Sequence, residues 1–458
     1  MSQAAAVPTQ KVVHPLRVRD FRLLWIGESI SLLGDQFYLI ALPWLVLQVT
    51  GSALALGMVL ALASIPRALF MLVGGVMVDR FSPRSVMLAS NLARMIFVSL
   101  LSLLVLTNNV QLWMLYALAL AFGTADAFYF PAQSAMVPAL LKDNQLEMGN
   151  TLTQGMAMLS MFVGPVLAGL VIAVLGRTAA DAAPGMGGIG IAFAIDAVSF
   201  LASVGVLWMI RTRKAGAPEQ TKVVTAIKEG MSYVWNSAVL RTIFILLIAI
   251  NLLVTGPFEV GIPVLADRNL IEGATAFGIL MSAYGGGALL GIILAGMLPK
   301  PKVALFGIVL LSVIGLLGIG MILLTISTST PIVALISLAM GTTMGYVNIN
   351  FMTWLQRRIP GHLMGRVMSL IMFASVGIAP VSSTLAGIIL NVNLSLLFVG
   401  AGGLMAVVAL AAATTRSIRQ MGFEVAEVET KESIAEILRS SSELPALRST
   451  GAMPAIRR

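Results

Sequence analysis

Residues 75–84 read GVMVDRFSPR and form a short charged elbow between two long apolar runs. The elbow places an acid and a base, Asp79 and Arg80, at the end of one run, and Arg84 at the beginning of the next. Gly75 has no side chain, so a neighbouring backbone can approach it closely within a membrane. Cytoplasmic connections of membrane proteins are enriched in bases, so the acid Asp79 requires a specific role. The stretch therefore predicts two membrane helices joined by a tight, charged turn.

The composition of the chain is that of an integral membrane protein. Hydrophobic residues make up 58% of the 458 residues, charged residues make up 11%, and the mean hydropathy is +0.95. Soluble globular domains carry roughly 25% charged residues. The chain has no cysteine, which excludes disulfides and thiol chemistry. The polar N-terminal segment lacks the short apolar core and cleavage site of a signal peptide, so we expect the first span to be retained.

The apolar runs predict an all-α membrane protein with twelve transmembrane helices in two six-helix halves. Each run is long enough to cross a hydrocarbon core of about 30 Å. Backbone polar groups find no water in lipid, so these runs are expected to be helical. The predicted spans are 21–48, 53–78, 86–106, 112–135, 150–175, 187–210, 240–262, 274–297, 302–325, 331–354, 366–390 and 394–414.

The longest interior polar connection divides the chain into two halves. Its second part, from Val224 to Leu240, has apolar residues at helical spacing and predicts an interfacial helix. Landmark residues recur between the halves at offsets of about 220, as parallel repeats of transporters do. The predicted units are a cytoplasmic N-terminal segment (1–20), an N-terminal half (21–210), a cytoplasmic connecting loop (211–239), a C-terminal half (240–415) and a largely disordered cytoplasmic tail (416–458).

The basic residues predict the orientation of the chain. Of the 29 Lys and Arg, only Arg177 and Arg268 fall in odd-numbered connections, and Arg67 and Arg94 lie within spans. All the others lie on the side of the N-terminus. Basic residues near span ends are retained in the cytoplasm, so both termini are expected to be cytoplasmic.

The charged elbow resembles the signature of the major facilitator superfamily, Gly-x-x-x-Asp-Arg-x-Gly-Arg-Arg, between its second and third spans. Four positions of the signature are matched, by Gly75, Asp79, Arg80 and Arg84. Ser82 and Pro83 replace a Gly and an Arg of the family. The resemblance implies that Asp79 closes a gate between the two halves. The N-terminus of the eleventh span, with Arg366, would offer that acid a positive partner.

Residues 164–169 read GPVLAG and resemble the antiporter motif of the superfamily, whose core is Gly-Pro-x-x-Gly-Gly on the fifth span. Gly164, Pro165 and Gly169 match, and Ala168 stands for a Gly. Proline removes a backbone donor and its small neighbours allow close packing, so the residues predict at least a kinked helix. In relatives the motif accompanies exporters, which implies export here.

Two further segments narrow the branch. Residues 20–25 (DFRLLW), with 34–37 (GDQF), are similar to the opening of the macrolide-efflux branch of drug:proton antiporters. Residues 365–369 (GRVMS), before the eleventh span, are similar to the same branch. The resemblance covers about residues 15–415 and implies a transporter driven by a proton gradient, without a cofactor.

Polar residues on one face of four spans are expected to line a central cavity. A spacing of three or four places residues on one helical face, and polar side chains in membrane helices avoid lipid. Spans one, four, seven and ten line the cavity of the superfamily, so the pattern and the resemblance agree. Hydrogen bonding between helices is the alternative for any single stripe. The residues are Glu28, Ser31, Asp35 and Tyr38; Asp126, Tyr129 and Gln133; Asn251, Thr255 and Glu259; and Tyr346, Asn350 and Thr353.

Five acids within spans are candidates for proton coupling. Asp35 and Arg67 lie roughly 21 Å and 17 Å from the cytoplasmic ends of adjacent spans, so they are expected to pair. Asp35 is the favoured proton carrier. Asp126, which has no evident partner at its depth, is the second candidate, and a purely structural Asp35–Arg67 pair is the alternative. The other three, which we assign to the substrate or to structure, are Glu28, Asp196 and Glu259.

These features predict a secondary transporter of the cell membrane that exports hydrophobic or amphipathic compounds by proton antiport with alternating access. Export of an endogenous siderophore or lysolipid fits the fold equally, and a non-transporting sensor is a third alternative. The chain is not expected to be an enzyme, because His14 and His362 form no metal set and no nucleotide-binding sequence is present. The expected partners are the lipid bilayer, protons and a small substrate, not nucleic acid, and we expect a monomer.

The orientation can be tested with single cysteines in this cysteine-free chain. We expect Gln10→Cys, Pro218→Cys and Ser442→Cys to resist an impermeant thiol reagent in intact cells, because all three positions are predicted to be cytoplasmic. Labelling of any of them from outside would contradict the predicted topology.

Overall fold

The computed structural model describes residues 14–176, 186–211, 231–298, 306–359 and 361–415. Some side chains within these ranges, among them those of Asp79 and Arg366, lie outside the description. Most of the connecting loop and the whole C-terminal tail lie outside it as well. Of the predicted interfacial helix, residues 231–236 are helical and the preceding residues are not described.

The N-terminal half contains six long helices. They follow a short 3-10 turn (η1, Pro15–Arg17), and a second 3-10 turn (η2, Asp143–Gln145) precedes the fifth helix. Prolines lie inside several of them, including Pro165 in the predicted kink. The helices are α1 (Arg19–Thr50), α2 (Ala53–Arg80), α3 (Pro83–Leu106), α4 (Leu112–Leu140), α5 (Leu146–Leu175) and α6 (Met186–Met209).

The C-terminal half also crosses six times, and its first crossing is interrupted. That crossing consists of α8 (Ala238–Gly256), a π-helical segment η3 (Pro257–Gly261) and α9 (Ile262–Asn269). The remaining helices are α10 (Ala274–Met297), α11 (Phe306–Leu323), α12 (Thr330–Arg358), α13 (Gly361–Leu390) and α14 (Leu394–Thr414). Within the described ranges, eleven helices are long and apolar enough to cross a membrane, and 307–323 is a shorter apolar helix. The all-helical fold in two halves is therefore confirmed.

The charged elbow is the tight turn that its sequence predicts. α2 ends at Arg80, and α3 begins at Pro83, whose fixed φ and missing N–H suit the first position of a helix. The Ser82 hydroxyl caps α3 by accepting a hydrogen bond of 3.2 Å from the Ser85 N–H. These local choices make adjacent helices antiparallel.

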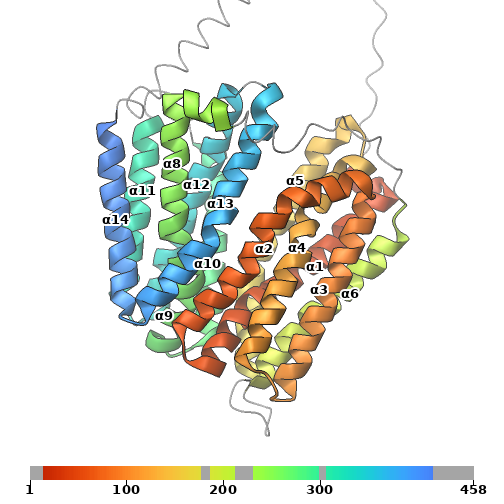
Figure 1. Ribbon diagram of the computed structural model, residues 1–458, viewed down its shortest axis with the longest axis horizontal. Coiled ribbons are helices and arrows are strands. Elements are labelled where there is room, and N and C mark those ends of the chain that lie inside the picture. Colours follow the sequence, from red (N-terminus) through yellow and green to blue (C-terminus); the bar gives the residue numbers. More distant parts are fainter. Residues whose placement is uncertain (1–13, 177–185, 212–230, 299–305, 360, 416–458) are drawn as a thin grey trace, which may run out of the picture.

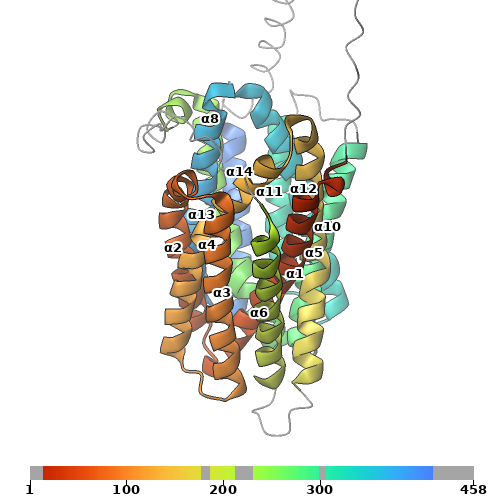
Figure 2. The same cartoon turned by 90° about the vertical axis from the view of Figure 1, so that its right-hand side faces the viewer.

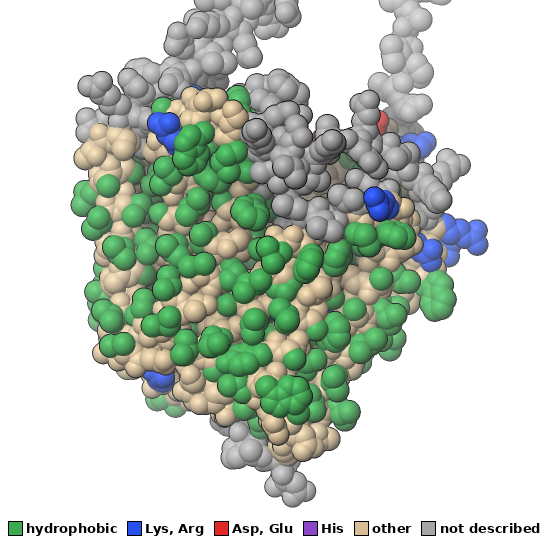
Figure 3. Space-filling view, in the orientation of Figure 1, with side chains coloured by type: hydrophobic (Ala, Val, Ile, Leu, Met, Phe, Trp, Pro, Cys, Tyr) green, Lys and Arg blue, Asp and Glu red, His purple; other side chains and the backbone are tan. Residues whose placement is uncertain are grey.

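The two halves lie side by side and diverge toward one end in Figure 1, whereas Figure 2 looks onto the N-terminal half, with most of the C-terminal half behind it. We call this end the terminal face, because α1 begins there and α14 ends there. The turn between α1 and α2 lies at the other end, which we call the opposite face. Figure 3 shows an apolar outer surface, with most of its visible Lys and Arg toward the terminal face. Such a surface suits contact with lipid tails.

Close contacts between the halves lie near the opposite face. There α2 meets α13, and α5 meets α10, with the backbones nearly touching. A Cβ atom added to Gly57 would lie 2.4 Å from the carbonyl oxygen of Ser383, and one added to Gly278 would lie 2.4 Å from that of Pro165. Only glycine permits this approach, as at other close helix crossings in membranes.

The antiporter-like stretch 164–169 contacts one helix of its own half and one helix of the other half. A Cβ on Gly164 would lie 2.4 Å from Gln36 Cγ of α1, and a Cβ on Gly169 would lie 2.6 Å from the Ala274 carbonyl oxygen of α10. The Val166 N–H donates to the Ser282 hydroxyl of α10 at 2.9 Å. The stretch thus joins the N-terminal half to the C-terminal half.

Gly278→Val tests this contact. We expect the added side chain to displace α10 from α5 and to cost about 1–3 kcal/mol, as overpacking does. The measurement is the melting temperature of the purified protein in detergent. Gly400→Val on α14 is the matched control, because no described atom lies within 4 Å of its added Cβ. Equal melting temperatures for the two variants would show that the α5–α10 contact tolerates a side chain.

Candidate functional site

A cavity of about 720 Å³ lies within the N-terminal half, lined mainly by α1, α4 and α5. From the described part of the C-terminal half, only Met372 and Val376 of α13 line it. Its size is that of cavities that bind drug-sized molecules. Its polar lining residues are Glu28, Ser29, Asp35, Tyr38, Arg67, Arg94, Asp126, Tyr129, Gln133, Ser134, Asn150, Thr153 and Gln154.

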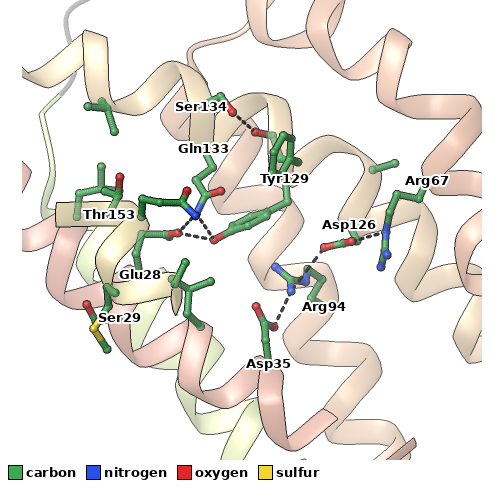
Figure 4. Close-up of a pocket in the computed structure, with 18 of the residues that line it drawn as sticks. Glu28, Ser29, Asp35, Arg67, Arg94, Asp126, Tyr129, Gln133, Ser134 and Thr153 are labelled. Carbon is green, nitrogen blue, oxygen red and sulfur yellow. Dashed lines mark hydrogen bonds and ion pairs between the residues drawn. The ribbon is translucent and has the colours of Figure 1, made fainter. Parts of the chain in front are cut away.

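Four charged side chains form a network at one end of the cavity (Figure 4). An Arg94 Nη2–Asp35 Oδ1 ion pair measures 2.7 Å, and the same nitrogen lies 3.6 Å from Asp126 Oδ1. Arg67 Nε lies 2.7 Å from Asp126 Oδ2. Helices α1 to α4 each supply one of the four residues. Two acids and two bases balance in charge, as a network at membrane depth must.

Arg94 is the fixed centre of this network. Its side chain is only 4% exposed. Its guanidinium carbon lies 4.4 Å from the ring centroid of Phe200, 4.6 Å from that of Tyr129 and 5.2 Å from that of Phe122. A guanidinium over aromatic faces gains about 2 kcal/mol or more when desolvated. The rings therefore hold Arg94 in place while its nitrogens face the two acids.

The predicted Asp35–Arg67 pair is wrong. Asp35 pairs with Arg94, and Arg67 pairs with Asp126, which was expected to have no partner. The number of residues from the end of a span gives the depth of a residue in the membrane, but it does not give the direction in which its side chain points. Arg94 could have been found from the sequence, because it is the only charged residue in the run 86–106.

Glu28 forms a separate polar cluster in the same cavity. Its Oε2 accepts hydrogen bonds from the Tyr129 hydroxyl and, at 2.7 Å, from Gln133 Nε2. Its Oε1 is buried without a hydrogen-bond partner among the described residues. The Glu28 residue is only 4% exposed. No described cation lies within ion-pair distance of it, which distinguishes it from Asp35 and Asp126.

Asp196, on α6, lies outside the cavity lining and is fully buried. The Ser199 hydroxyl donates to its backbone oxygen at 2.7 Å and lies 3.3 Å from its Oδ1. Ser199 and Asp196 pack so closely on Gly34 of α1 that an added Cβ there would lie 1.9 Å from the Ser199 hydroxyl. This setting agrees with the structural role expected for Asp196.

The predicted polar stripes do not all meet in one cavity. Asn251, Thr255 and Glu259 line a second cavity in the C-terminal half. Ser31 is fully buried and lines neither cavity. Tyr346, Asn350 and Thr353 also line neither. The amide of Asn350 and the hydroxyl of Thr353 instead donate to carbonyl groups one turn earlier on α12, each at 2.8 Å.

The gate residues are only partly described. Gly75 lies within α2, and the side chains of Asp79 and Arg366, which were predicted to meet, lie outside the described residues. Arg84 donates to the carbonyl oxygens of Leu207 at 2.7 Å and Trp208 at 2.8 Å, and Arg80 is exposed. Arg84 thus ties the elbow to the end of α6, within one half.

Known proteins resemble the chain over most of its length. The family model of the Major Facilitator Superfamily matches residues 24–384. The multidrug efflux pump Tap of Mycolicibacterium fortuitum is 27% identical over 369 residues, which cover 77% of this chain and 85% of the pump. Macrolide efflux protein A of Streptococcus pyogenes is 28% identical over 154 residues, which cover 34% of this chain and 38% of that protein.

Solved structures resemble the fold. A bacterial homologue of the iron transporter ferroportin in an inward-facing state has a TM-score of 0.67 and 14% identity, covering 87% of this chain and 99% of that one. An inward-facing bacterial homologue of the lysosomal transporter Spinster has a TM-score of 0.65 and 11% identity, covering 91% of this chain and 98% of that one.

In the described ranges of the present structure, no group of three or more His, Asp or Glu could hold a metal ion.

A double-mutant cycle tests the Asp35–Arg94 ion pair. Arg94→Met alone leaves Asp35 buried without its partner, which we expect to cost about 3–5 kcal/mol. Asp35→Asn added to Arg94→Met removes the stranded charge and should restore much of the melting temperature of the purified protein. A double variant no more stable than Arg94→Met would contradict the pairing.

Proposed function

The chain belongs to the Major Facilitator Superfamily, and from this premise we propose that it exports hydrophobic or amphipathic compounds, of drug or macrolide type, by proton antiport. It is a membrane transporter and not an enzyme. Its relatives Tap and macrolide efflux protein A are efflux pumps. A large cavity with apolar walls and a few convergent polar groups suits substrates that share hydrophobicity rather than one shape.

The observation that carries this proposal is a drug-sized cavity in the N-terminal half of a molecule whose two halves touch near only one face. Close backbone contacts join the halves near the opposite face, and the halves diverge toward the terminal face. Such one-sided closure is one of the two states of alternating access. With both termini cytoplasmic, as proposed from the basic residues, this state takes substrate from the cytoplasm or the inner leaflet.

We further propose that Asp35 carries the proton and that Arg94 is its exchange partner. In this state Asp35 lies 2.7 Å from Arg94 Nη2, and we take its carboxylate to be ionised here. An antiporter releases its proton inward before it takes up substrate, so an ionised carrier fits the inward-facing state. Protonation of Asp35 would break the pair and leave one uncompensated positive charge at membrane depth, which is costly. That cost would favour rearrangement of the cavity.

Asp126 remains the second candidate for the proton carrier. It faces Arg67 at 2.7 Å and Arg94 at 3.6 Å, so two cations oppose its protonation. If Asp35 were protonated, Arg94 could turn fully to Asp126. We propose that Asp126 is the acceptor of Arg94 in the protonated state, and that Glu28, with Tyr129 and Gln133, contacts the substrate.

The gate proposal follows the family motif. We propose that Asp79 binds the N-terminal end of α13 and Arg366 when the terminal face closes. The protein would act as a monomer in the cell membrane.

Transport is tested by accumulation of macrolides and dyes in efflux-deficient cells. The wild-type chain should lower accumulation, and an uncoupler should abolish that effect. Asp35→Asn should still bind substrate but should reduce proton release from the purified protein on substrate addition by at least about tenfold, because the exchanging carboxyl is gone. Glu272→Gln, the same type of exchange in the connection before α10, is the control.

Undiminished proton release by Asp35→Asn would remove Asp35 from the coupling proposal and direct the test to Asp126. Equal accumulation in cells with and without the chain would contradict export of these compounds.

A further inference from the structure

The C-terminal half contains a cavity of its own, of about 310 Å³. It is enclosed by α8, η3, α10, α11 and α12. Its lining residues do not overlap with those of the first cavity. Most are aliphatic or aromatic, including Val313, Ile314 and Leu317 of α11, which are buried.

The spans that line this cavity correspond in chain order to those that supply the charge network in the other half. In the N-terminal half, spans one to four each supply one charged residue to the network. Spans seven to ten, which the repeat predicts to correspond to them, enclose the second cavity. Glu259 is the only charged residue among the described residues that line it. The four spans that supply ion pairs in one half therefore line a mostly apolar cavity in the other.

Glu259 lies on the π-helical segment η3, which interrupts the seventh span. Such wide turns often occur at functional sites. Its side chain is exposed on the cavity wall, and its Oε2 accepts a hydrogen bond of 2.9 Å from the Ser383 hydroxyl of α13. The neighbouring Ser382 hydroxyl accepts from the Gly256 N–H at 2.7 Å and donates to the Leu252 carbonyl at 2.6 Å. α13 therefore holds the acid and its wide turn together.

No described cation forms an ion pair with Glu259. Arg67, on the other side of the interface, is paired with Asp126, whose Oδ2 lies 2.7 Å from its Nε. The Asn251 side-chain nitrogen donates to the Leu247 carbonyl oxygen at 2.8 Å. The Asn251 side-chain oxygen can therefore accept a contact from a ligand. An acid without a cation, beside an apolar hollow and an amide oxygen, has the chemistry that binds an apolar compound with one positive charge.

We propose that this cavity is a second binding site, separate from the first, for an amphipathic ammonium compound. The apolar body lies against α10, α11 and α12, and the cationic nitrogen lies at Glu259. The site requires neither export nor proton coupling, so it does not depend on the proposed function.

An occupant would also act on the contact between the halves. The Ser383 hydroxyl binds Glu259, and the Ser383 carbonyl oxygen is the atom that packs against Gly57 of α2. A cation at Glu259 would therefore lie next to the residue that makes the α2–α13 contact. The second site is thereby placed to alter closure of the opposite face.

The test is equilibrium binding of radiolabelled benzyltrimethylammonium to the purified full-length protein in detergent. Neopentylbenzene, in which carbon replaces the charged nitrogen, is the neutral competitor of the same shape. We expect Glu259→Gln to weaken binding of the cation at least tenfold, and neopentylbenzene to compete at least tenfold less well than the unlabelled cation. Val313→Phe, which fills the cavity and leaves the acid in place, should also weaken binding tenfold.

Ile319→Phe is the matched control on the same helix, because Ile319 is exposed and lies outside the cavity lining. We expect its affinity to stay within twofold of the wild-type value. Unchanged affinity in both Glu259→Gln and Val313→Phe would overturn the proposal. So would loss of binding in Glu28→Gln alone, because the cation would then occupy the first cavity. Failure of export in cells, with this binding intact, would refute only the proposed function.

Discussion

A charge at membrane depth needs an opposite charge, and the N-terminal half is arranged around Arg94 for this reason. The guanidinium lies among three aromatic rings and reaches Asp35 on α1 and Asp126 on α4. Arg67 of α2 completes the balance. The packing of four helices thus depends on one neutral set of four charged side chains. A proton that binds to either acid gives this set a net positive charge. The contact that keeps this set of charges neutral is also the one that we propose for proton coupling.

The two halves share a fold but not an interior. The N-terminal half buries ion pairs and holds the larger cavity, whereas the C-terminal half holds one acid beside an apolar hollow. The difference lies in side chains, because both halves cross the membrane six times with the same connectivity. A repeated scaffold has therefore been given two different internal environments.

The sequence predicts the number of spans well because apolar runs of sufficient length have no alternative to helices in lipid. It also predicts the elbow, since Ser82 and Pro83 begin a helix by local chemistry. It fails on the Asp35–Arg67 pair, because helix rotation is set by packing partners distant in sequence. It fails on the stripe of α12 for the same reason. The stripe Asn251, Thr255 and Glu259 does share a cavity, but not the one expected, and no local pattern indicates which helices enclose it.

The contact that closes the opposite face is made largely by backbone atoms and glycines, including Gly57, Gly278 and the Pro165 carbonyl. None of these residues lines the larger cavity. Side chains that line the larger cavity can therefore be exchanged in evolution without altering the contact that closes the opposite face. A lineage of such transporters can acquire new substrates by point substitutions in the cavity, whereas the glycine contacts between its halves tolerate almost no substitution.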